Sequence, residues 1–140
     1  MKINLRKIIE TSIDAKTKML NVNLEAIDNA CKLMLGSVNG GNKILWCGNG
    51  GSAADSQHMS AELMGGLRSH TRDPIPSIAL STDSSFLTAW SNDTSFDDIF
   101  SRQIEGIGLP GDILVAISTS GNSTNVLNAI KTAQNKDIKS

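Results

Sequence analysis

The sequence predicts an α/β fold built around a parallel sheet. From about residue 42 onward, short apolar segments of strand length alternate with longer segments of helical periodicity. Two of the apolar segments run straight into loops of glycine, serine and asparagine, and a helical segment follows each loop. Strands and helices that alternate in this way form right-handed crossovers, which place the strands parallel in one sheet. Ligand sites in such sheets lie beyond the carboxyl ends of the strands, where both loops are expected.

Two amphipathic helices are expected before the first strand. Gly40-Gly41-Asn42 interrupts the second helical pattern. The sequence therefore predicts one domain over residues 1–140, with N-terminal helices in residues 1–39 and an α/β core in residues 42–140. The apolar residues at helical spacing are Leu5, Ile8, Ile9, Ile13 and Leu20, followed by Leu24, Ile27, Cys31, Met34 and Leu35.

The predicted core contains three strands, at residues 43–47, 77–80 and 113–117. Helices are expected at residues 52–64, 86–90, 97–107 and 125–134. Ser52 can cap the first of these helices, and Gly65-Gly66 can end it. Asp137-Ile138-Lys139-Ser140 resembles the start of a further strand. We therefore expect the sheet to be incomplete and the natural fold to continue past Ser140.

Composition and charge exclude several classes of function. The formal net charge is −1, so no basic surface favours nucleic acid. The apolar runs are about as long as a strand, which is too short to span a membrane, and the N-terminus lacks the apolar segment of a secretory signal. Cys31 and Cys47 lie in apolar periodic segments and are expected to be buried, reduced thiols rather than metal ligands. These features predict a cytoplasmic protein.

The segment from Val115 to Ser123 is the most informative in the sequence. An apolar strand leads into hydroxyls, a glycine and an amide, and a helix begins at about Asn125. Backbone N–H groups at the start of a helix favour an anion, and serine and threonine hydroxyls supply further donors. The loop has no lysine or arginine, which suits a phosphate that is held rather than hydrolysed. Ser118, Ser120 and Ser123 are therefore candidate phosphate ligands.

A second loop of similar design is Gly48-Asn49-Gly50-Gly51-Ser52-Ala53. It matches the looser dinucleotide pattern G-x-G-x-x-A, but a single match is weak evidence, and the expected acidic residue, Asp83, lies late for a ribose contact. No lysine follows the glycines, so the loop is not a Walker A motif. Two interpretations remain open: a turn that lets strand and helix pack closely, or an approach of backbone amides to a sugar or its phosphate. Two such loops in one small domain favour a sugar-phosphate site.

His58 and Glu62 are spaced i, i+4 on the helix expected after the glycine loop, so they share one face. Three interpretations are open: a solvated polar surface, a pair of metal ligands, or a base beside its orienting partner. Asn92-Asp93 lies between two expected helical segments, where it can form a turn or cap the helix that begins near Phe96.

Taken together, these residues resemble the SIS (sugar isomerase) domain, and most of all the phosphoheptose isomerase family. The resemblance covers nearly the whole chain, and its motifs are long and ordered, which makes them more specific than the glycine pattern alone. It implies a three-layer αβα sandwich in which a parallel sheet follows two N-terminal helices. The matching stretches are Cys47 to His58, Ala61-Glu62-Leu63, Leu87-Thr88-Ala89, Asn92-Asp93, Asp98 to Gln103, and Gly111-Asp112 through to the loop that ends at Ser123.

The resemblance implies roles for particular residues. Glu62 would be a catalytic acid or base, and Asn92 and Asp93 would contact the sugar chain. In members that bind zinc, His58 and Glu62 would supply ligands to one zinc ion per subunit. Ser52, Ser118, Thr119, Ser120 and Ser123 would hold the phosphate end of the substrate. The other residues implied to contact substrate are Asn49, Gly50 and Gly51.

The implied activity is the conversion of sedoheptulose 7-phosphate to D-glycero-D-manno-heptose 7-phosphate, an aldose–ketose isomerisation that serves lipopolysaccharide and other surface polysaccharides. Proton transfer between C1 and C2 through an ene-diol(ate) needs a base at the carbon, a proton donor at the oxygens and a fixed phosphate. Members of the family are cytoplasmic homotetramers with sites shared between subunits.

This chain departs from the family pattern in one motif and in its length. Family members often carry an arginine in a Glu-Leu-x-Gly-Arg pattern, whereas here Gly66 occupies that place and Arg68 comes two residues later. The family also continues for tens of residues, with a Gln-Glu-x-His…His pattern that completes the zinc site and supplies the second acid/base. We therefore expect residues 1–140 alone to bind sugar phosphate weakly, to hold little zinc and not to be a competent isomerase.

Other functions fit the same resemblance. Closely related SIS proteins bind the bacterial replication initiator DnaA, and their loop reads Ser-Thr-Arg-Gly-Asn-Ser, whereas Ser120 matches the isomerase form. A SIS domain that senses a sugar phosphate without chemistry is the remaining alternative. An isomerase assay on the full-length protein with sedoheptulose 7-phosphate separates these functions.

Overall fold

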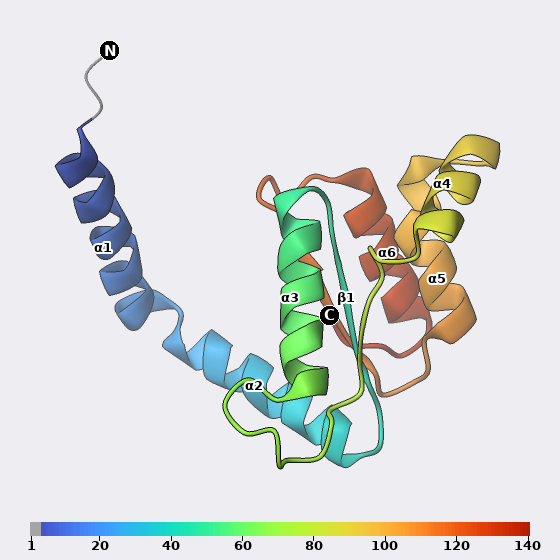
Figure 1. Ribbon diagram of the computed structural model, residues 1–140, viewed down its shortest axis with the longest axis horizontal. Helices are drawn as coiled ribbons and strands as arrows, with labels where there is room; N and C mark the ends of the chain where they lie inside the picture. Colours follow the sequence, from blue (N-terminus) through green and yellow to red (C-terminus); the bar gives the residue numbers. More distant parts are fainter. Residues whose placement is uncertain (1–3) are drawn as a thin grey trace. The chain divides into compact units, whose positions relative to one another are not determined.

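The computed structural model describes residues 4–140. By its internal contacts the chain divides into two compact units, one that extends to Leu33 and one from Met34 to Ser140. Figure 1 shows the order of the elements along the chain. None of the helices in residues 4–140 combines the length and the apolar character needed to cross a membrane.

The first unit is helical, as the sequence predicts. It contains α1 (Leu5–Val22) and the first part of α2 (Leu24–Asn39). The side chain of Asn4 caps α1 by accepting a hydrogen bond of 3.1 Å from the backbone N–H of Lys7. None of the residues of α1 is buried, and the apolar side chains that form its predicted stripe are exposed. Cys31 is also exposed, so its predicted burial is wrong, whereas Cys47 in the second unit is buried as expected.

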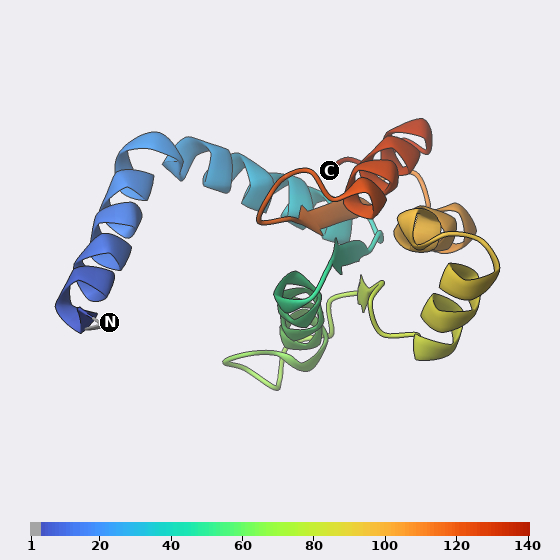
Figure 2. The same cartoon turned by 90° about the horizontal axis from the view of Figure 1, so that it is seen from above.

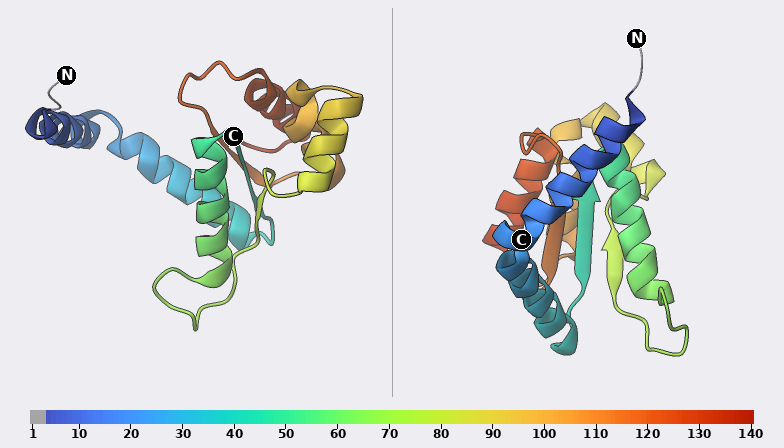
Figure 3. Two further views of the ribbon diagram at one scale, coloured as in Figure 1. Left: turned by 45° about the horizontal axis from the view of Figure 1, so that its top comes forward. Right: turned by 90° about the vertical axis from the view of Figure 1, so that its left-hand side faces the viewer.

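The second unit is an α/β fold with a parallel sheet, which confirms the predicted fold class. The strands are β1 (Ile44–Gly48), β2 (Ser77–Ala79) and β3 (Ile113–Ile117), in the order β2-β1-β3. β1 pairs in parallel with both neighbours, so the carboxyl ends of the strands lie at one edge of the sheet (Figure 3). The glycine and serine loops leave the sheet at this edge.

Helices cover both faces of the sheet. Figure 2 shows α3 (Gly51–Gly65) on one side of the strands and α6 (Thr124–Asn135) on the other. α5 (Ile99–Ile107) packs beside α6, and α4 (Ser84–Asp93) and the 3-10 helix η1 (Phe96–Asp98) precede it in the chain. This arrangement is the three-layer sandwich that the family resemblance implies.

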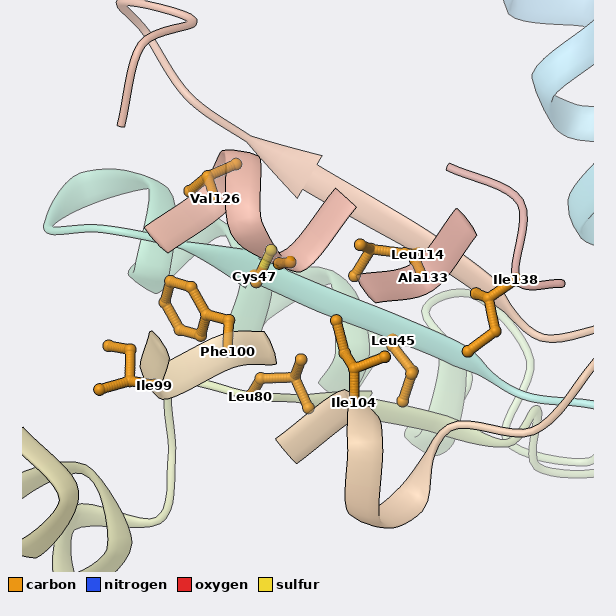
Figure 4. Close-up of a cluster of buried hydrophobic side chains, with 11 residues drawn as sticks. Leu45, Cys47, Leu80, Ile99, Phe100, Ile104, Leu114, Val126, Ala133 and Ile138 are labelled. Carbon is orange, nitrogen blue, oxygen red and sulfur yellow. The ribbon is translucent and has the colours of Figure 1, made fainter. Parts of the chain in front are cut away.

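The hydrophobic core lies between the sheet and the α5–α6 pair (Figure 4). Every residue of β1 is buried, as expected for a central parallel strand. Leu45 and Cys47 enter this core, and burial raises the pKa of the Cys47 thiol to about 12, so it stays protonated. On the opposite face, Trp46 Nε1 donates a 2.8 Å hydrogen bond to the Ser77 hydroxyl, which contacts the Ser60 hydroxyl at 3.1 Å.

The buried carboxylate of Asp112 links the residues that precede β1 and β3, at the amino end of the sheet. Asp112 is 1% exposed and accepts hydrogen bonds from Lys43 Nζ at 2.6 Å, the Lys43 N–H at 3.0 Å and the Leu109 N–H at 2.8 Å. Burial alone would raise the pKa of Asp112, but the hydrogen bonds from Lys43 and Leu109 and the charge of Lys43 outweigh it. The pKa of Asp112 therefore lies below its usual value.

The last residues run along the outer side of β3. Lys139 forms a parallel bridge with Ile113, and the N–H of Leu114 donates a 2.8 Å hydrogen bond to the carbonyl of Lys139. Ile138 is 2% exposed and belongs to the core. The expected start of a strand at residues 137–140 thus corresponds to one isolated parallel bridge rather than to a strand.

Candidate active site

The two loops that the sequence singles out meet at the carboxyl edge of the sheet. They enclose a cavity of about 170 Å³, which contains one residue at the end of β3 and polar residues of both loops. The cavity therefore combines all five residues that the family resemblance assigns to the phosphate end of the substrate. Its lining consists of Asn49, Ser52, Ile117, Ser118, Thr119, Ser120 and Ser123.

Serine hydroxyls converge in the loop after β3. The Ser118 oxygen lies 3.3 Å from the Ser123 oxygen and 3.5 Å from the Ser120 oxygen. Backbone N–H groups already donate to these oxygens, from Gly121 to Ser118 at 3.1 Å and from Asn122 to Ser120 at 3.2 Å. The two contacts between hydroxyls use at most two of the three O–H hydrogens, so at least one can point to a ligand. The cluster is a donor site suited to an anion.

Helix N-termini strengthen this preference for an anion. Ser123 is the N-cap of α6, but no side chain in residues 4–140 caps the first turn of that helix. Gly50 is the N-cap of α3, again without a side-chain cap among the described residues. Uncapped first turns leave backbone N–H groups and the positive end of the helix dipole toward the cavity. An anion such as phosphate can satisfy both.

The glycine loop serves packing and ligand access at different positions. A Cβ atom on Gly48 would lie 2.7 Å from the Ser52 Cβ, so only glycine lets β1 and α3 approach so closely. Gly50 has a φ of +55°, and a Cβ on Gly50 or Gly51 would meet no atom within 4 Å. Gly48 thus fits the packing interpretation, and the open sides of Gly50 and Gly51 fit the approach of a ligand.

Ser52 is not the helix cap that the sequence predicts. Gly50 takes that position with a φ of +55° and a ψ of −119°, a conformation that favours glycine, and α3 begins at Gly51. Ser52 therefore lies inside the first turn, where its N–H bonds to the carbonyl of Asn49 at 2.9 Å. Its side chain contributes to the cavity instead of capping the helix.

Sequence reasoning missed Asn125, which lies beside this cavity. Asn125 is 2% exposed and forms two reciprocal hydrogen bonds with Asn49. Asn125 Nδ2 donates to Asn49 Oδ1 at 2.9 Å, and Asn49 Nδ2 donates to Asn125 Oδ1 at 2.8 Å. The pair ties the glycine loop to the first turn of α6. An asparagine next to an expected helix start is a signal for a cap, so the sequence offered no hint of this partner.

His58 and Glu62 lie in a different cavity. Glu62 follows Ser52 by ten residues on α3, which is ~15 Å along the helix axis. The His58 Nε2 and Glu62 Oε1 atoms are 3.9 Å apart, and the Glu62 side chain is 29% exposed. Within one chain, the pair is therefore not brought together with the phosphate loops. The second cavity, of about 560 Å³, is lined by His58, Glu62, Met34, Trp46, Met59, Leu63, Leu67, Arg68, Ser69, Arg72 and Ile75.

Arg72 holds the end of α3 that carries Glu62, a role that sequence reasoning also missed. Its guanidinium donates to the carbonyls of Glu62 at 2.8 Å and Leu63 at 2.7 Å, which lie at the negative end of the helix. Gly66 caps the same helix with a φ of +85°, and a Cβ there would lie 2.5 Å from the Ser69 carbonyl oxygen. The arginine of the family pattern therefore does not fit at Gly66 in this conformation, and Arg68 lines the second cavity instead.

Asn92 and Asp93 form the last turn of α4 rather than the predicted turn between helices. Asn92 Nδ2 donates a 2.7 Å hydrogen bond to Asp93 Oδ1, and both residues are exposed. The following helix η1 is capped by Ser95, which accepts from the N–H of Asp97 at 3.0 Å. Neither Asn92 nor Asp93 lines the two cavities, so their implied contact with the sugar chain stays a prediction.

The described residues of one copy do not form a zinc site by themselves. No group of three or more His, Cys, Asp and Glu side chains gathers anywhere in residues 4–140. Catalytic zinc typically has three protein ligands, whereas the His58–Glu62 pair offers two. Any zinc bound by this pair would need a further ligand.

Comparisons with known proteins agree with this fold. The SIS domain family model matches residues 9–139. A phosphoheptose isomerase of Shewanella sp. (strain ANA-3) is 51% identical over 138 residues, which are 99% of this chain and 68% of that protein.

Solved structures of phosphoheptose isomerases are similar as well. The structure from Neisseria gonorrhoeae has a TM-score of 0.88 at 44% identity over 96% of this chain and 69% of that one. The structure from Francisella tularensis has a TM-score of 0.93 at 37% identity over 96% of this chain and 70% of that one. The chain therefore belongs to the SIS-domain family and, within it, to the phosphoheptose isomerases.

Proposed function

We propose that this chain acts in the isomerisation of sedoheptulose 7-phosphate to D-glycero-D-manno-heptose 7-phosphate, in the cytoplasm, for lipopolysaccharide synthesis. The observation that carries the proposal is the cavity at the carboxyl edge of the sheet. Serine hydroxyls and two uncapped helix N-termini converge there. Such a site holds the phosphate of a sugar firmly and leaves the far end of the sugar free to react.

The reaction requires transfer of one proton between C1 and C2. Glu62 is the proposed base, which removes a proton from the carbon next to the carbonyl and returns it to the neighbouring carbon. The intermediate is an ene-diol(ate), and a proton donor near the oxygens must stabilise it. The phosphate cradle supplies orientation, because a substrate fixed at one end presents its other end to the base in one geometry.

We propose that the assembled enzyme is a homotetramer whose active sites combine residues of different copies. The supporting observation is that Glu62 and the phosphate loops line separate cavities within one chain. A second copy can bring its Glu62 toward the phosphate loops of the first. The exposed apolar stripe on α1, which includes Leu5, Ile8 and Ile9, is a surface of the kind that subunits bury on association.

Mixing two impaired variants of the full-length enzyme tests the shared site. Glu62→Gln removes the base and Ser120→Asp weakens the hold on the phosphate, so each variant alone is expected to have low activity when the substrate concentration lies below the wild-type dissociation constant. After the two are unfolded and refolded together, a mixed assembly contains sites with an intact Glu62 from one copy and an intact Ser120 from another. Activity should return to a substantial fraction of wild type. If each site lies within one chain, no mixture of the variants recovers activity.

We also propose His58 and Glu62 as two ligands of a zinc ion in the assembled enzyme. The pair supports this proposal through its i, i+4 placement and its 3.9 Å separation on α3. Imidazole nitrogen and carboxylate oxygen are ordinary zinc ligands. When bound, zinc would polarise the substrate oxygens; every other role proposed here belongs to the protein's own residues.

Ser120→Asp is expected to weaken binding of sedoheptulose 7-phosphate about tenfold or more. The new carboxylate would lie where the phosphate carries its own charge, and repulsion at ~4 Å is worth roughly 1–4 kcal/mol at effective dielectrics of 80 to 20. Isothermal titration calorimetry measures the affinity. Ser120→Ala is the matched control, because it removes the hydroxyl without adding charge and should cost less. Unchanged affinity in Ser120→Asp would exclude the loop from the site, and firm binding without turnover in the wild type would favour a sensing domain.

A further inference from the structure

We propose that Asn125 is a positioning residue that holds the two substrate loops at a fixed spacing and sets the orientation of the Asn49 amide. This inference rests on the proposed function. Asn125 is the second residue of α6, is 2% exposed and does not line the phosphate cavity. Asn49 does line it. Asn125 therefore acts on the substrate through Asn49 rather than by contact.

The two amides form a closed pair across the site. Each side chain donates to the oxygen of the other, at 2.9 Å from Asn125 and 2.8 Å from Asn49. The residues are 76 positions apart in the sequence, one directly after β1 and the other in the first turn of α6. The pair is thus a direct link between the glycine loop and the helix that begins after the serine loop.

The link has a consequence for the cavity walls. Ser52 lies three residues after Asn49, and Ser123 lies two residues before Asn125; both line the cavity. The distance between these walls must match a phosphate group for donors on both sides to reach it. Two hydrogen bonds between Asn49 and Asn125 restrict that distance better than apolar packing would, because hydrogen bonds weaken steeply with changes in length and angle.

The link also fixes which atoms Asn49 offers to a ligand. An asparagine amide has two N–H donors and an oxygen with two acceptor positions. The pair with Asn125 uses one N–H and one acceptor position of Asn49, which leaves one of each. A sugar hydroxyl both donates and accepts, so it matches the remaining pair. Without Asn125, the Asn49 amide can rotate and exchange its donor and acceptor sides.

Asn125→Ala tests the proposal in a binding experiment. The variant is expected to bind sedoheptulose 7-phosphate about tenfold more weakly or worse, because both loops lose their link and a polar group of Asn49 loses its partners. Asn128→Ala is the matched control. Asn128 also lies on α6 and also makes two hydrogen bonds, to the Asp97 carbonyl at 3.1 Å and Asp98 Oδ1 at 3.2 Å. Its loss should leave the affinity within about twofold, since these bonds anchor α6 to η1 away from the cavity.

A double-mutant cycle separates positioning from simple packing. If Asn125 acts through Asn49, the pair Asn49→Ala and Asn125→Ala should be strongly non-additive, and the double variant should bind about as well as the weaker single variant. If Asn125 only fills space, the two losses of affinity multiply. Multiplying losses would overturn the proposal.

A conservative variant and a second measurement distinguish the proposed role of Asn125 from a simple loss of folding. Asn125→Asp keeps the shape and can accept from Asn49 Nδ2, but its carboxylate cannot donate to Asn49 Oδ1 and adds a negative charge close to the phosphate site, so affinity should also fall. Backbone hydrogen exchange of the unliganded chain should speed up at residues 50–52 and 121–124 in both variants but not in Asn128→Ala. Wild-type affinity and wild-type exchange in Asn125→Asp would overturn the proposal. A folded wild-type chain that fails to bind sugar phosphate would instead refute the proposed function.

Discussion

In the full-length enzyme, replacing Glu62 with glutamine is expected to lower isomerase turnover by about 10²–10⁴-fold. Glutamine preserves the size and the hydrogen-bonding oxygen of the side chain but cannot accept the substrate proton. The side chain lies in a cavity and is 29% exposed, so the substitution removes no buried charge pair and should leave the fold intact. Turnover is measured with sedoheptulose 7-phosphate, and affinity for the same sugar is measured by calorimetry.

The decisive pattern is a loss of turnover without a matching loss of affinity. The phosphate loops, which carry most of the proposed binding, line a separate cavity and are unchanged by this variant. Glu105→Gln is a matched control on α5. Glu105 is an exposed glutamate that pairs with Arg102 at 3.0 Å and lines neither cavity. Turnover within about threefold of wild type in Glu62→Gln would assign the base to another residue.

The strands and most helices follow from local sequence pattern. β1 to β3 were predictable because each is a short apolar run bounded by glycine, proline or polar residues, and each lies within one residue of the expected bounds. The end of α4 was not, because Asn92-Asp93 has the composition of a turn but continues the helix to Asp93. The start of α3 was also misplaced. Glycine allows the positive φ of Gly50 but does not require it, so the residue type alone does not predict where the helix begins.

The candidate site also has parts that were predictable from the sequence and parts that were not. The serine loop was predictable because its hydroxyls are contiguous in sequence and the helix N-terminus follows at once. The separation of Glu62 from that loop was not, because i, i+4 spacing with His58 defines a shared helix face without saying what that face meets. The role of Asn125 was not predictable for a related reason, because its hydrogen-bond partner, Asn49, is 76 residues away in the sequence. Contacts between distant segments depend on how the crossovers pack, which no short motif encodes.

Asp112→Ala is expected to destabilise the second unit by about 3–5 kcal/mol, because removing one partner of a buried pair leaves the other charge uncompensated. Lys43 is 17% exposed and would lose its 2.6 Å partner, and the N–H of Leu109 would lose its acceptor. Denaturant unfolding measures the free energy. The control is Glu105→Ala, which breaks the Arg102–Glu105 pair, 53% exposed on each side, and should cost about 1 kcal/mol or less. Replacing Lys43 and Asp112 together with apolar residues should cost less than Asp112→Ala alone.

The loss of stability in Asp112→Ala is expected to depend on pH, because the Asp112 carboxylate titrates. The pKa of Asp112 is lower in the folded protein than in the unfolded chain. At acid pH the unfolded state therefore binds more protons, and the free energy of unfolding decreases as the pH is lowered. The contribution of Asp112 is fully present above the unfolded pKa of about 3.9 and is lost as the pH drops below it through the lower folded pKa. Wild type and Asp112→Ala should therefore differ most at neutral pH and converge under acid conditions, as followed by urea midpoints from pH 7 to pH 2. A difference that stays constant over this range would mean that Asp112 stabilises the fold by packing rather than through its charge.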